Sequence, residues 1–250
     1  MTYTIGAEKY YDLFGYKNDA SFYINLASKY NKALELGVGT ARLAIQLAQA
    51  GIEVWGIDNS PFMLRAAESN LRREIPEIQN RIHLLLADVR NFELGERFEF
   101  IYFPSFSYDH LLTSEEQFST LQSIRKHLTP TGVYVFDLAH YTLLKATSTL
   151  FVQRKLLDKH RKVIRVGLKR IKPKERLMSI DLWYELYEDG SMIDRYHEGG
   201  DVFIHSPKGI QEVLEDNGFK IIKWYGGYDG RSFTETSELM ILVTQLKHVH

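Results

Sequence analysis

Acidic residues and glycines stand where the first three predicted strands of the chain end. Glu35 lies at the end of the first strand and Gly37 and Gly39 follow it, Asp58 ends the second strand, and Asp88 follows the third. Glycines let a backbone turn tightly and approach a ligand, and the free N–H groups of a helix that follows suit a carboxylate or a phosphate. Ligands of open α/β sheets bind at the carboxyl ends of the strands. The spacing therefore predicts one ligand site lined by three carboxylates.

The residue types also select among ligands for this site. Arg42 takes the place of the third Gly of a dinucleotide fingerprint, and Glu35 would repel a pyrophosphate but suits a cationic ammonium group. Asp58 follows Gly39 by 19 residues, which suits an acid that binds ribose hydroxyls. Asp88 can accept a hydrogen bond from an adenine amino group. A ligand with an amino-acid end, a ribose and an adenine is S-adenosylmethionine, and methyl transfer converts it to S-adenosylhomocysteine.

Short apolar runs alternate with helical patterns between residues 32 and 138. This alternation predicts βαβ units and a doubly wound, mostly parallel sheet with helices on both faces. Ser60-Pro61 and the capping box at Thr113 open two of the helices, and Pro76 is expected to end the first of them. Strands are expected at 32–36, 52–57, 82–86, 98–103 and 132–138, and again at 219–225 and 239–244 after a helix that ends at Gly218.

The segment from residue 151 to 203 has a different pattern, with long, partly alternating runs. Asp189-Gly190 suits a two-residue hairpin turn. We therefore expect an antiparallel β insert after the fifth strand. The expected organisation is a cofactor-binding core with an N-terminal helical lid over residues 1–150, the insert on the substrate side over 151–205, and a return to the core sheet over 206–250.

The motifs resemble those of the class I S-adenosylmethionine-dependent methyltransferases. Residues 35–40 (ELGVGT) resemble the first motif of the family, 56–64 (GIDNSPFML) the second and 87–89 (ADV) the third. The resemblance covers about residues 32–138 and implies a Rossmann-like sheet of seven strands with the last one antiparallel. The chain departs from the pattern at Ala41, where the family often has Gly.

The resemblance also implies which residues bind the cofactor. The first motif would hold the methionine end, the second the ribose, and the third the adenine. An aromatic face suits the sulfonium through cation–π attraction, which adds an aromatic residue at the end of the fourth strand. The implied cofactor-binding residues are Glu35, Gly37, Gly39, Asp58, Asn59, Met63, Asp88, Val89 and Phe103.

Residues 103–128 are similar to a small-molecule branch of the family, which includes sugar N,N-dimethyltransferases with an antiparallel platform. Some members have a His after strand four and an N-terminal Tyr that lines the acceptor site, and His110 and Tyr11 take those roles here as candidate catalytic residues. Residues 103–106 (FPSF) differ from the signature of many nucleic-acid amino methyltransferases. The implied reaction is methyl transfer to a nitrogen or oxygen atom of a small molecule.

Other functions stay open at the level of sequence. Residues 151–176 carry eleven Lys or Arg against two Asp or Glu, which suits tRNA or a protein as methyl acceptor. Residues 181–201 carry seven Asp or Glu against one Arg, so opposite charges that face each other across a β ladder are the favoured explanation of both segments. A nicotinamide-dependent reductase on a similar sheet, and a module that binds the cofactor without turnover, are further alternatives.

Composition narrows the class of protein. The 250 residues carry a formal charge of −1, 44% hydrophobic residues and no Cys. These values exclude a basic surface over the whole protein, disulfides and Cys-ligated metals, and the His spacing indicates no metal site. No apolar run approaches the roughly 18 residues of a membrane helix, and Glu8 and Asp12 interrupt the place of a signal peptide. We expect a cytoplasmic enzyme with a small-molecule partner.

Overall fold

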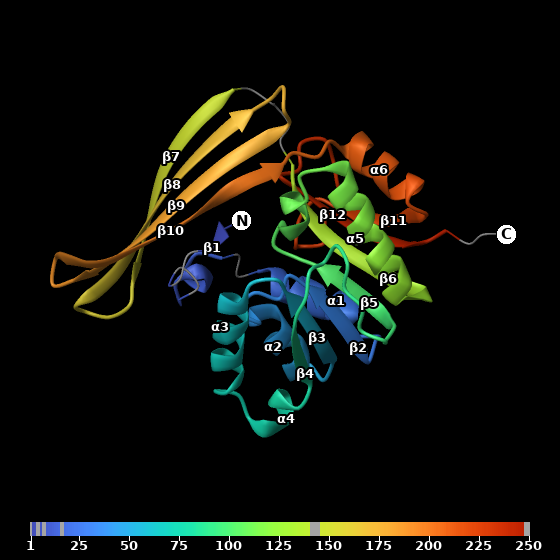
Figure 1. Cartoon of the computed structure of the whole chain (residues 1–250), viewed down its shortest axis with the longest axis horizontal. Coiled ribbons are helices and arrows are strands. Elements are labelled where there is room, and N and C mark those ends of the chain that lie inside the picture. Colours follow the sequence, from blue (N-terminus) through green and yellow to red (C-terminus); the bar gives the residue numbers. More distant parts are fainter. Residues whose placement is uncertain (1, 4–5, 7–8, 16–17, 141–145, 248–250) are drawn as a thin grey trace. The chain divides into compact units, whose positions relative to one another are not determined.

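The computed structural model describes residues 2–3, 6, 9–15, 18–140 and 146–247, and the chain forms two compact units (Figure 1). Residues 16–142 and 205–250 form the first, which we call the α/β unit, and residues 1–15 and 143–204 form the second, the sheet unit. Within the described part of the chain, every helix is too short or too polar to cross a membrane.

The α/β unit contains a seven-stranded sheet in the order β11-β12-β6-β5-β2-β3-β4. The strands are β2 (Lys32–Leu36), β3 (Glu53–Asp58), β4 (Ile82–Leu86), β5 (Phe98–Phe103), β6 (Leu128–Ala139), β11 (Phe219–Tyr225) and β12 (Leu239–Leu246). The five strands from β6 to β4 pair in parallel, whereas β12 is antiparallel to both β6 and β11. The predicted mostly parallel sheet of seven strands with an antiparallel last strand is confirmed.

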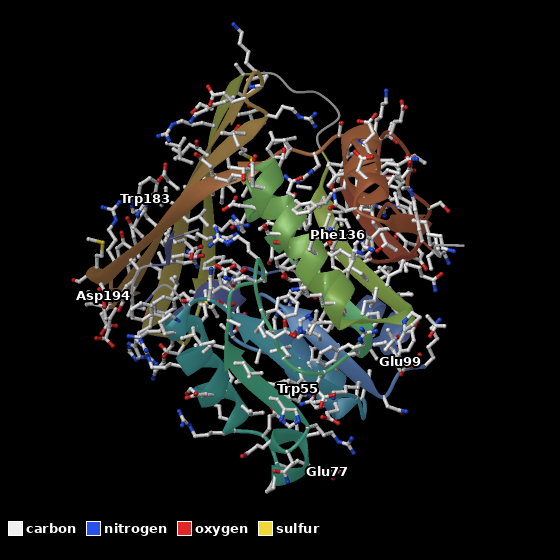
Figure 2. The ribbon with its side chains drawn as sticks, turned by 45° about the vertical axis from the view of Figure 1, so that its right-hand side comes forward. Trp55, Glu77, Glu99, Phe136, Trp183 and Asp194 are labelled. Atoms are coloured by element: carbon white, nitrogen blue, oxygen red, sulfur yellow. The ribbon has the colours of Figure 1, made fainter. Side chains whose placement is uncertain are left out.

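Helices cover both faces of this sheet, as the doubly wound prediction requires. They are α1 (Asp19–Ala27), α2 (Arg42–Gln49), α3 (Pro61–Leu71), α4 (Pro76–Gln79), α5 (Ser114–His127) and α6 (Pro207–Asp216). Leu47 of α2 and Leu64 of α3 belong to the apolar cluster on one face. Leu121 of α5 and Leu214 of α6 belong to the cluster on the other, where Phe136 of β6 lies beside α5 (Figure 2). The strands between these layers are buried on both sides.

Local signals set most helix ends. Ser60 accepts the N–H of Met63 at 3.3 Å and caps α3, and Thr113 forms the predicted capping box with Glu116 at the start of α5. The prediction that Pro76 ends α3 is wrong, because α3 already ends at Leu71. Pro76 is instead the first residue of the short helix α4, where its missing N–H is not needed.

The sheet unit is an antiparallel sheet in the order β1-β10-β9-β8-β7, in agreement with the predicted insert. Its strands are β1 (Thr2–Tyr3), β7 (Thr147–Leu156), β8 (Arg161–Lys172), β9 (Leu177–Glu188) and β10 (Ser191–Phe203). Asp189 and Gly190 have φ angles of 46° and 87°, as a two-residue hairpin turn requires. The core of this unit is small, with Val163, Leu182 and Tyr184 fully or almost fully buried.

The N-terminal segment differs from expectation. The sequence predicts a helical lid on the core, but β1 pairs with β10, and Leu13 and Phe14 pack on the small core of the sheet unit. A short 3-10 helix (Tyr11–Leu13) and α1 are the helices described in this stretch. The pairing partner of β1 lies almost 200 residues further along the chain, so a local pattern could not reveal it.

Candidate active site

The loop between β2 and α2 is a left-handed turn built on glycines. Gly37 and Gly39 have φ angles of 66° and 54°, a region that glycine enters without steric cost. Ala41, at the start of α2, has a φ of 62°, a conformation that favours the Gly which the family resemblance implies at this place. A side chain at Gly56 of β3 would bring a Cβ within 2.6 Å of Val38, so this glycine lets the loop lie close to the sheet.

Asp58 stabilises this loop from the end of β3. Its carboxylate is 8% exposed and accepts the N–H of Gly39 and the N–H of Ser60, each at 2.8 Å and on different oxygens. Burial raises the pKa of Asp58, and the backbone N–H groups partly offset that rise. Because each carboxylate oxygen has two lone pairs, Asp58 keeps acceptor capacity toward ribose hydroxyls.

Glu35 lies at the end of β2 and is 2% exposed. The Tyr102 hydroxyl donates to its Oε2 at 2.8 Å. Burial raises the pKa of Glu35 to about 8, against the opposing effects of Tyr102 and Arg42. A buried acid with so high a pKa suits a ligand that brings its own positive charge. Tyr102 was not predicted, and its place on the neighbouring strand is the signal that could have found it.

Arg42 has a structural partner that sequence reasoning also missed. Its guanidinium donates to both oxygens of Asp19 at 2.9 and 2.5 Å, and Asp19 is fully buried in α1. This ion pair ties α1 to the first turn of α2. The part of the expected N-terminal lid that forms α1 is therefore fixed within the α/β unit.

The remaining predicted residues after β3 and β4 have different surroundings. Asn59 is exposed directly after β3, whereas Met63, in the first turn of α3, is 1% exposed. Val89 packs against the apolar cluster beneath α5. Asn59 is thus available to a ligand through its side chain, and Met63 and Val89 act first as packing residues.

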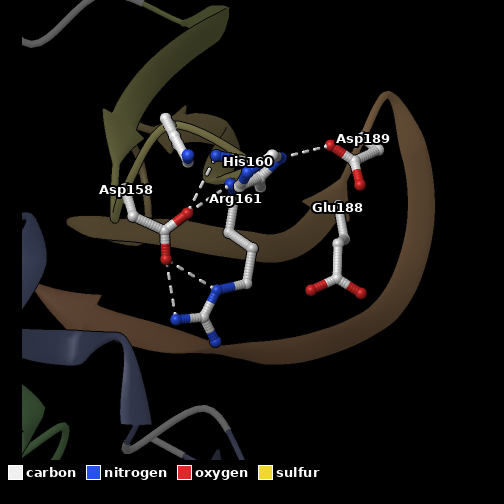
Figure 3. A pocket seen from close by; sticks show the side chains of 6 residues that line it. Asp158, His160, Arg161, Glu188 and Asp189 are labelled. Atoms are coloured by element: carbon white, nitrogen blue, oxygen red, sulfur yellow. Dashed lines mark hydrogen bonds and ion pairs between the residues drawn. The ribbon is translucent and has the colours of Figure 1, made fainter.

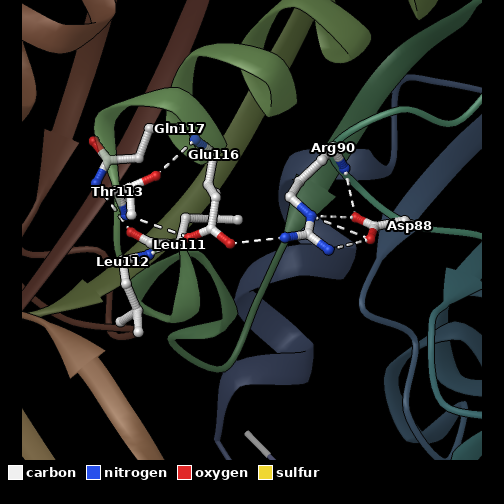
Figure 4. Close-up of polar contacts among 7 residues, drawn as sticks. All are labelled: Asp88, Arg90, Leu111, Leu112, Thr113, Glu116 and Gln117. Atoms are coloured by element: carbon white, nitrogen blue, oxygen red, sulfur yellow. Dashed lines mark hydrogen bonds and ion pairs between the residues drawn. The ribbon is translucent and has the colours of Figure 1, made fainter.

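Asp88 is bonded to a residue that was not predicted. The Arg90 side chain donates to both of its oxygens, at distances between 2.6 and 3.1 Å, and also to Glu116 at 2.7 Å (Figure 4). This pairing holds the pKa of Asp88 below its usual range. Arg90 thereby joins the end of β4 to the capping box of α5. An adenine amino group would have to share the Asp88 carboxylate with Arg90.

A second left-handed turn follows β5. Ser105 and Phe106 have φ angles of 63° and 60°, although neither is glycine. Their N–H groups donate to the Asp137 carboxylate at 3.1 and 2.6 Å. The 3-10 helix η3 (Ser107–His110) begins directly after the turn. This arrangement was not predicted, because its acid lies on the next strand of the sheet.

The glycine loop and the turn after β5 meet within the α/β unit. A Cβ built at Gly37 would lie 3.2 Å from a ring carbon of Phe103 and 3.6 Å from the side chain of Ser107. Phe103 is 3% exposed. The structure therefore brings together two of the predicted residues, Gly37 and Phe103, from strands β2 and β5.

The two candidate catalytic residues lie in different units. His110 ends η3 in the α/β unit, and Tyr11 lies in the 3-10 helix of the sheet unit. Beside His110, the buried Asp109 and His205 approach to 3.9 Å, a pair that the sequence did not indicate. Within the described residues, His, Asp and Glu side chains form no group of three or more that could hold a metal ion.

The charged strands of the sheet unit partly neutralise one another. Arg170 of β8 pairs with Asp181 of β9 at 3.0 Å, and Arg161 stands opposite Glu188. For these residues the prediction of opposite charges across the ladder is confirmed. Figure 3 shows a pocket at the hairpin ends, where Arg161 contacts Asp158 and His160 contacts Asp189, each at 2.7 Å. Its charged groups mostly bind one another.

Comparison with known proteins identifies a domain in the chain. Residues 33–132 match the family described as a methyltransferase domain. YqeM of Bacillus subtilis (strain 168), named as a candidate methyltransferase, is 31% identical over 107 residues, which cover 42% of this chain and 41% of YqeM. The chain thus spans less than half the length of that curated relative.

Solved structures agree with the fold over almost the whole chain. The CcbJ methyltransferase from Streptomyces caelestis is similar with a TM-score of 0.83 and 19% identity, covering 99% of each chain. CalS10 from Micromonospora echinaspora, an amino pentose methyltransferase solved with S-adenosylmethionine, is similar with a TM-score of 0.72 and 18% identity, again over 99% of each chain. The comparisons thus show a methyltransferase domain over residues 33–132 and, over almost the whole chain, the fold of these S-adenosylmethionine-dependent methyltransferases.

Proposed function

We propose that this protein binds S-adenosylmethionine and transfers its methyl group to a nitrogen or oxygen atom of a small-molecule acceptor. The observation that carries the proposal is the glycine loop after β2. Asp58 accepts the N–H of Gly39 in this loop, and the buried Glu35 lies on β2 just before it. This loop lies inside the matched methyltransferase domain.

The polar groups of the site can be assigned to the methionine, ribose and adenine parts of the cofactor in turn. Glu35 suits the ammonium group, and the glycine loop before α2 offers N–H groups to the carboxylate. Asp58 suits the ribose hydroxyls, with Asn59 beside it and Met63 packed below. Asp88 and Val89 are assigned to the adenine end, with Arg90 as a competing partner of Asp88.

When bound, S-adenosylmethionine supplies a methyl group that its sulfonium makes electrophilic. The chain has to hold the acceptor in line at about 3–3.5 Å and keep water out. Phe103, buried against Gly37, offers an aromatic face toward the sulfonium. We assign proton removal from an acceptor amine to His110, because imidazole titrates near neutral pH, and acceptor binding to Tyr11.

We assign acceptor selection to the sheet unit, within the segment 151–205 expected to form the substrate side. Tyr10, Phe14 and Tyr196 pack around the core of this unit, and the Arg165 guanidinium lies 4.6 Å from the centre of the Phe14 ring. Such ring clusters suit sugar-like or aminated small molecules. The amino pentose named for CalS10 is an acceptor of this kind.

The test is a calorimetric titration of the purified chain with S-adenosylhomocysteine, with NADH in parallel. We expect micromolar binding of S-adenosylhomocysteine alone, and its loss in Asp58→Ala and Asp58→Asn. Asp229→Ala is the matched control, since Asp229 forms an exposed ion pair with Arg231 at 2.7 Å in the same unit. Transfer of a labelled methyl group to amines and alcohols then identifies the acceptor class.

Three outcomes would overturn the proposal. Binding of NADH instead of S-adenosylhomocysteine would favour the nicotinamide-dependent reductase. Binding of neither ligand, by folded protein shown to be free of retained cofactor, would remove the methyltransferase assignment. Tight S-adenosylhomocysteine binding without transfer to any acceptor class would support a cofactor-binding module without turnover.

A further inference from the structure

We infer that Asp137 is a positioning residue for the active site, because its carboxylate fixes the left-handed turn at Ser105 and Phe106. Through that turn, Asp137 fixes the positions of Phe103 and Ser107 relative to the glycine loop. This inference rests on the proposed function and adds to it a buried acid on β6 that touches neither cofactor nor acceptor.

The carboxylate of Asp137 accepts three hydrogen bonds inside the protein. Asp137 is fully buried, and it accepts the N–H of Ser105 on Oδ2 and the N–H of Phe106 on Oδ1. The Tyr23 hydroxyl of α1 donates to Oδ2 at 2.5 Å. Burial raises the pKa of Asp137, and the neighbouring Tyr23 and Tyr228 side chains counteract that rise. Because the carboxylate is fully buried and accepts three internal hydrogen bonds, we assign it a structural role and not ligand binding.

The turn needs such a partner because its backbone conformation is unfavourable. Ser105 and Phe106 are consecutive residues with φ near +60°, and a bulky residue such as Phe rarely adopts this conformation. Successive N–H groups in such a turn form a concave anion-binding site. Asp137 occupies that site, and the two hydrogen bonds offset the strain.

The turn at Ser105 and Phe106 determines the position of Phe103 and Ser107, the two residues that face the glycine loop. Phe103 ends β5 just before the turn, and Ser107 begins η3 just after it. Both side chains would contact a Cβ at Gly37, at 3.2 and 3.6 Å. At the far end of η3 stands His110. If the turn left its left-handed conformation, Phe103, Ser107 and the candidate catalytic His110 would therefore move together.

The substitution Asp137→Asn breaks this arrangement with little change in volume. Each carboxylate oxygen of Asp137 receives one backbone N–H, whereas an Asn side chain has a single acceptor oxygen. In either orientation its NH₂ group faces a backbone N–H. Tyr23→Phe removes a phenol donor but leaves both backbone hydrogen bonds in place, so it should affect the turn less.

The experiment combines hydrogen exchange of the full chain with calorimetry using S-adenosylhomocysteine. In Asp137→Asn we expect exchange of residues 104–111 to rise at least tenfold, and the affinity for S-adenosylhomocysteine to fall about tenfold. Tyr23→Phe should show smaller changes in the same direction. Glu198→Gln is the matched control, because Glu198 is also a buried acid bonded to a Tyr, at 2.7 Å from Tyr184, but lies in the sheet unit.

A folded Asp137→Asn variant with unchanged exchange at residues 104–111 would overturn the inference, and so would a loss of affinity equal to that of Glu198→Gln. If Asp137→Asn fails to fold, the graded response of Tyr23→Phe and Tyr228→Phe decides in its place. If the unmodified protein does not bind S-adenosylhomocysteine, the proposed function fails, while the exchange measurement still tests the role of Asp137 in the turn.

Discussion

The loop after β2 and the turn after β5 use the same left-handed backbone but are stabilised differently. Gly37 and Gly39 enter this region without strain because they lack a side chain. Ser105 and Phe106 enter it with side chains and depend on hydrogen bonds from their N–H groups to Asp137. The first loop is therefore a property of its own residues, and the second is a property of a contact across the sheet.

The buried acids beside these two segments differ in the same way. Glu35 accepts a hydrogen bond from Tyr102, and burial raises the pKa of Glu35 to about 8. Asp137 accepts three hydrogen bonds, and burial raises its pKa only to about 6. A buried acid with one hydrogen bond is suited to receive a cationic ligand, whereas a buried acid with three serves the internal structure.

The largest expected effect concerns the pH dependence of stability through Glu35. Because its pKa is raised from 4.5 to about 8 on folding, its contribution to stability is present below pH 4.5 and is lost as pH rises to about 8. Between pH 5 and pH 8.5 the unmodified chain should lose about 3–5 kcal/mol relative to Glu35→Gln. Urea unfolding of both proteins at the two pH values measures this difference, and parallel pH curves would contradict it.

Gly56→Ala should displace the glycine loop, because Gly56 on β3 contacts Val38 in that loop. The added methyl group would lie 2.6 Å from Val38, and overpacking of this kind costs about 1–3 kcal/mol. We expect a matching loss in unfolding free energy and weaker S-adenosylhomocysteine binding. The double variant Gly56→Ala/Val38→Ala removes the clash and should regain most of the binding. If the double variant does not regain S-adenosylhomocysteine binding, the contact between residues 56 and 38 does not determine the position of the glycine loop.

Gly37→Ala should lower binding by strain and by crowding against Phe103 at 3.2 Å. A left-handed Ala costs about 1–2 kcal/mol, so the affinity for S-adenosylhomocysteine should fall about tenfold. Gly95→Ala is the matched control, since Gly95 has nearly the same φ, 68°, with no atom within 4 Å of the added Cβ. Equal effects of the two variants on calorimetric binding would show that backbone strain alone, and not the contact with Phe103, matters.

Ala41→Gly should have the smallest effect. Relief of the left-handed strain gains about 1–2 kcal/mol, whereas the lost burial of the methyl group and the greater freedom of the unfolded chain cost a similar amount. The unfolding free energy should therefore change by less than about 1 kcal/mol, although Ala41 is fully buried. A change above about 2 kcal/mol in denaturant unfolding would show that one of these contributions is misjudged.

Much of the cofactor side was predictable because its signals are local. Hydrophobic runs placed β2, β4 and β5 at their observed bounds, and Ser60 and Thr113 set the starts of α3 and α5. The site residues that were missed, Tyr102, Arg90 and Asp137, belong to strands or loops outside the motifs. Neighbouring strands bring Tyr102 beside Glu35 and Asp137 beside the turn after β5, whereas Arg90 follows Asp88 by two residues and carries no recognisable motif.

The βαβ order, the glycine loop and the acids at the strand ends follow from the amino-acid sequence alone, because periodicity, capping and glycine conformation act over a few residues. The hydrogen-bond partners of each acid follow only from the folded chain. Tyr23 reaches Asp137 across 114 residues of chain, and β1 pairs with β10, almost 200 residues further along the sequence. Such pairings depend on how strands and helices pack, and burial among those partners then sets the charge of each acid.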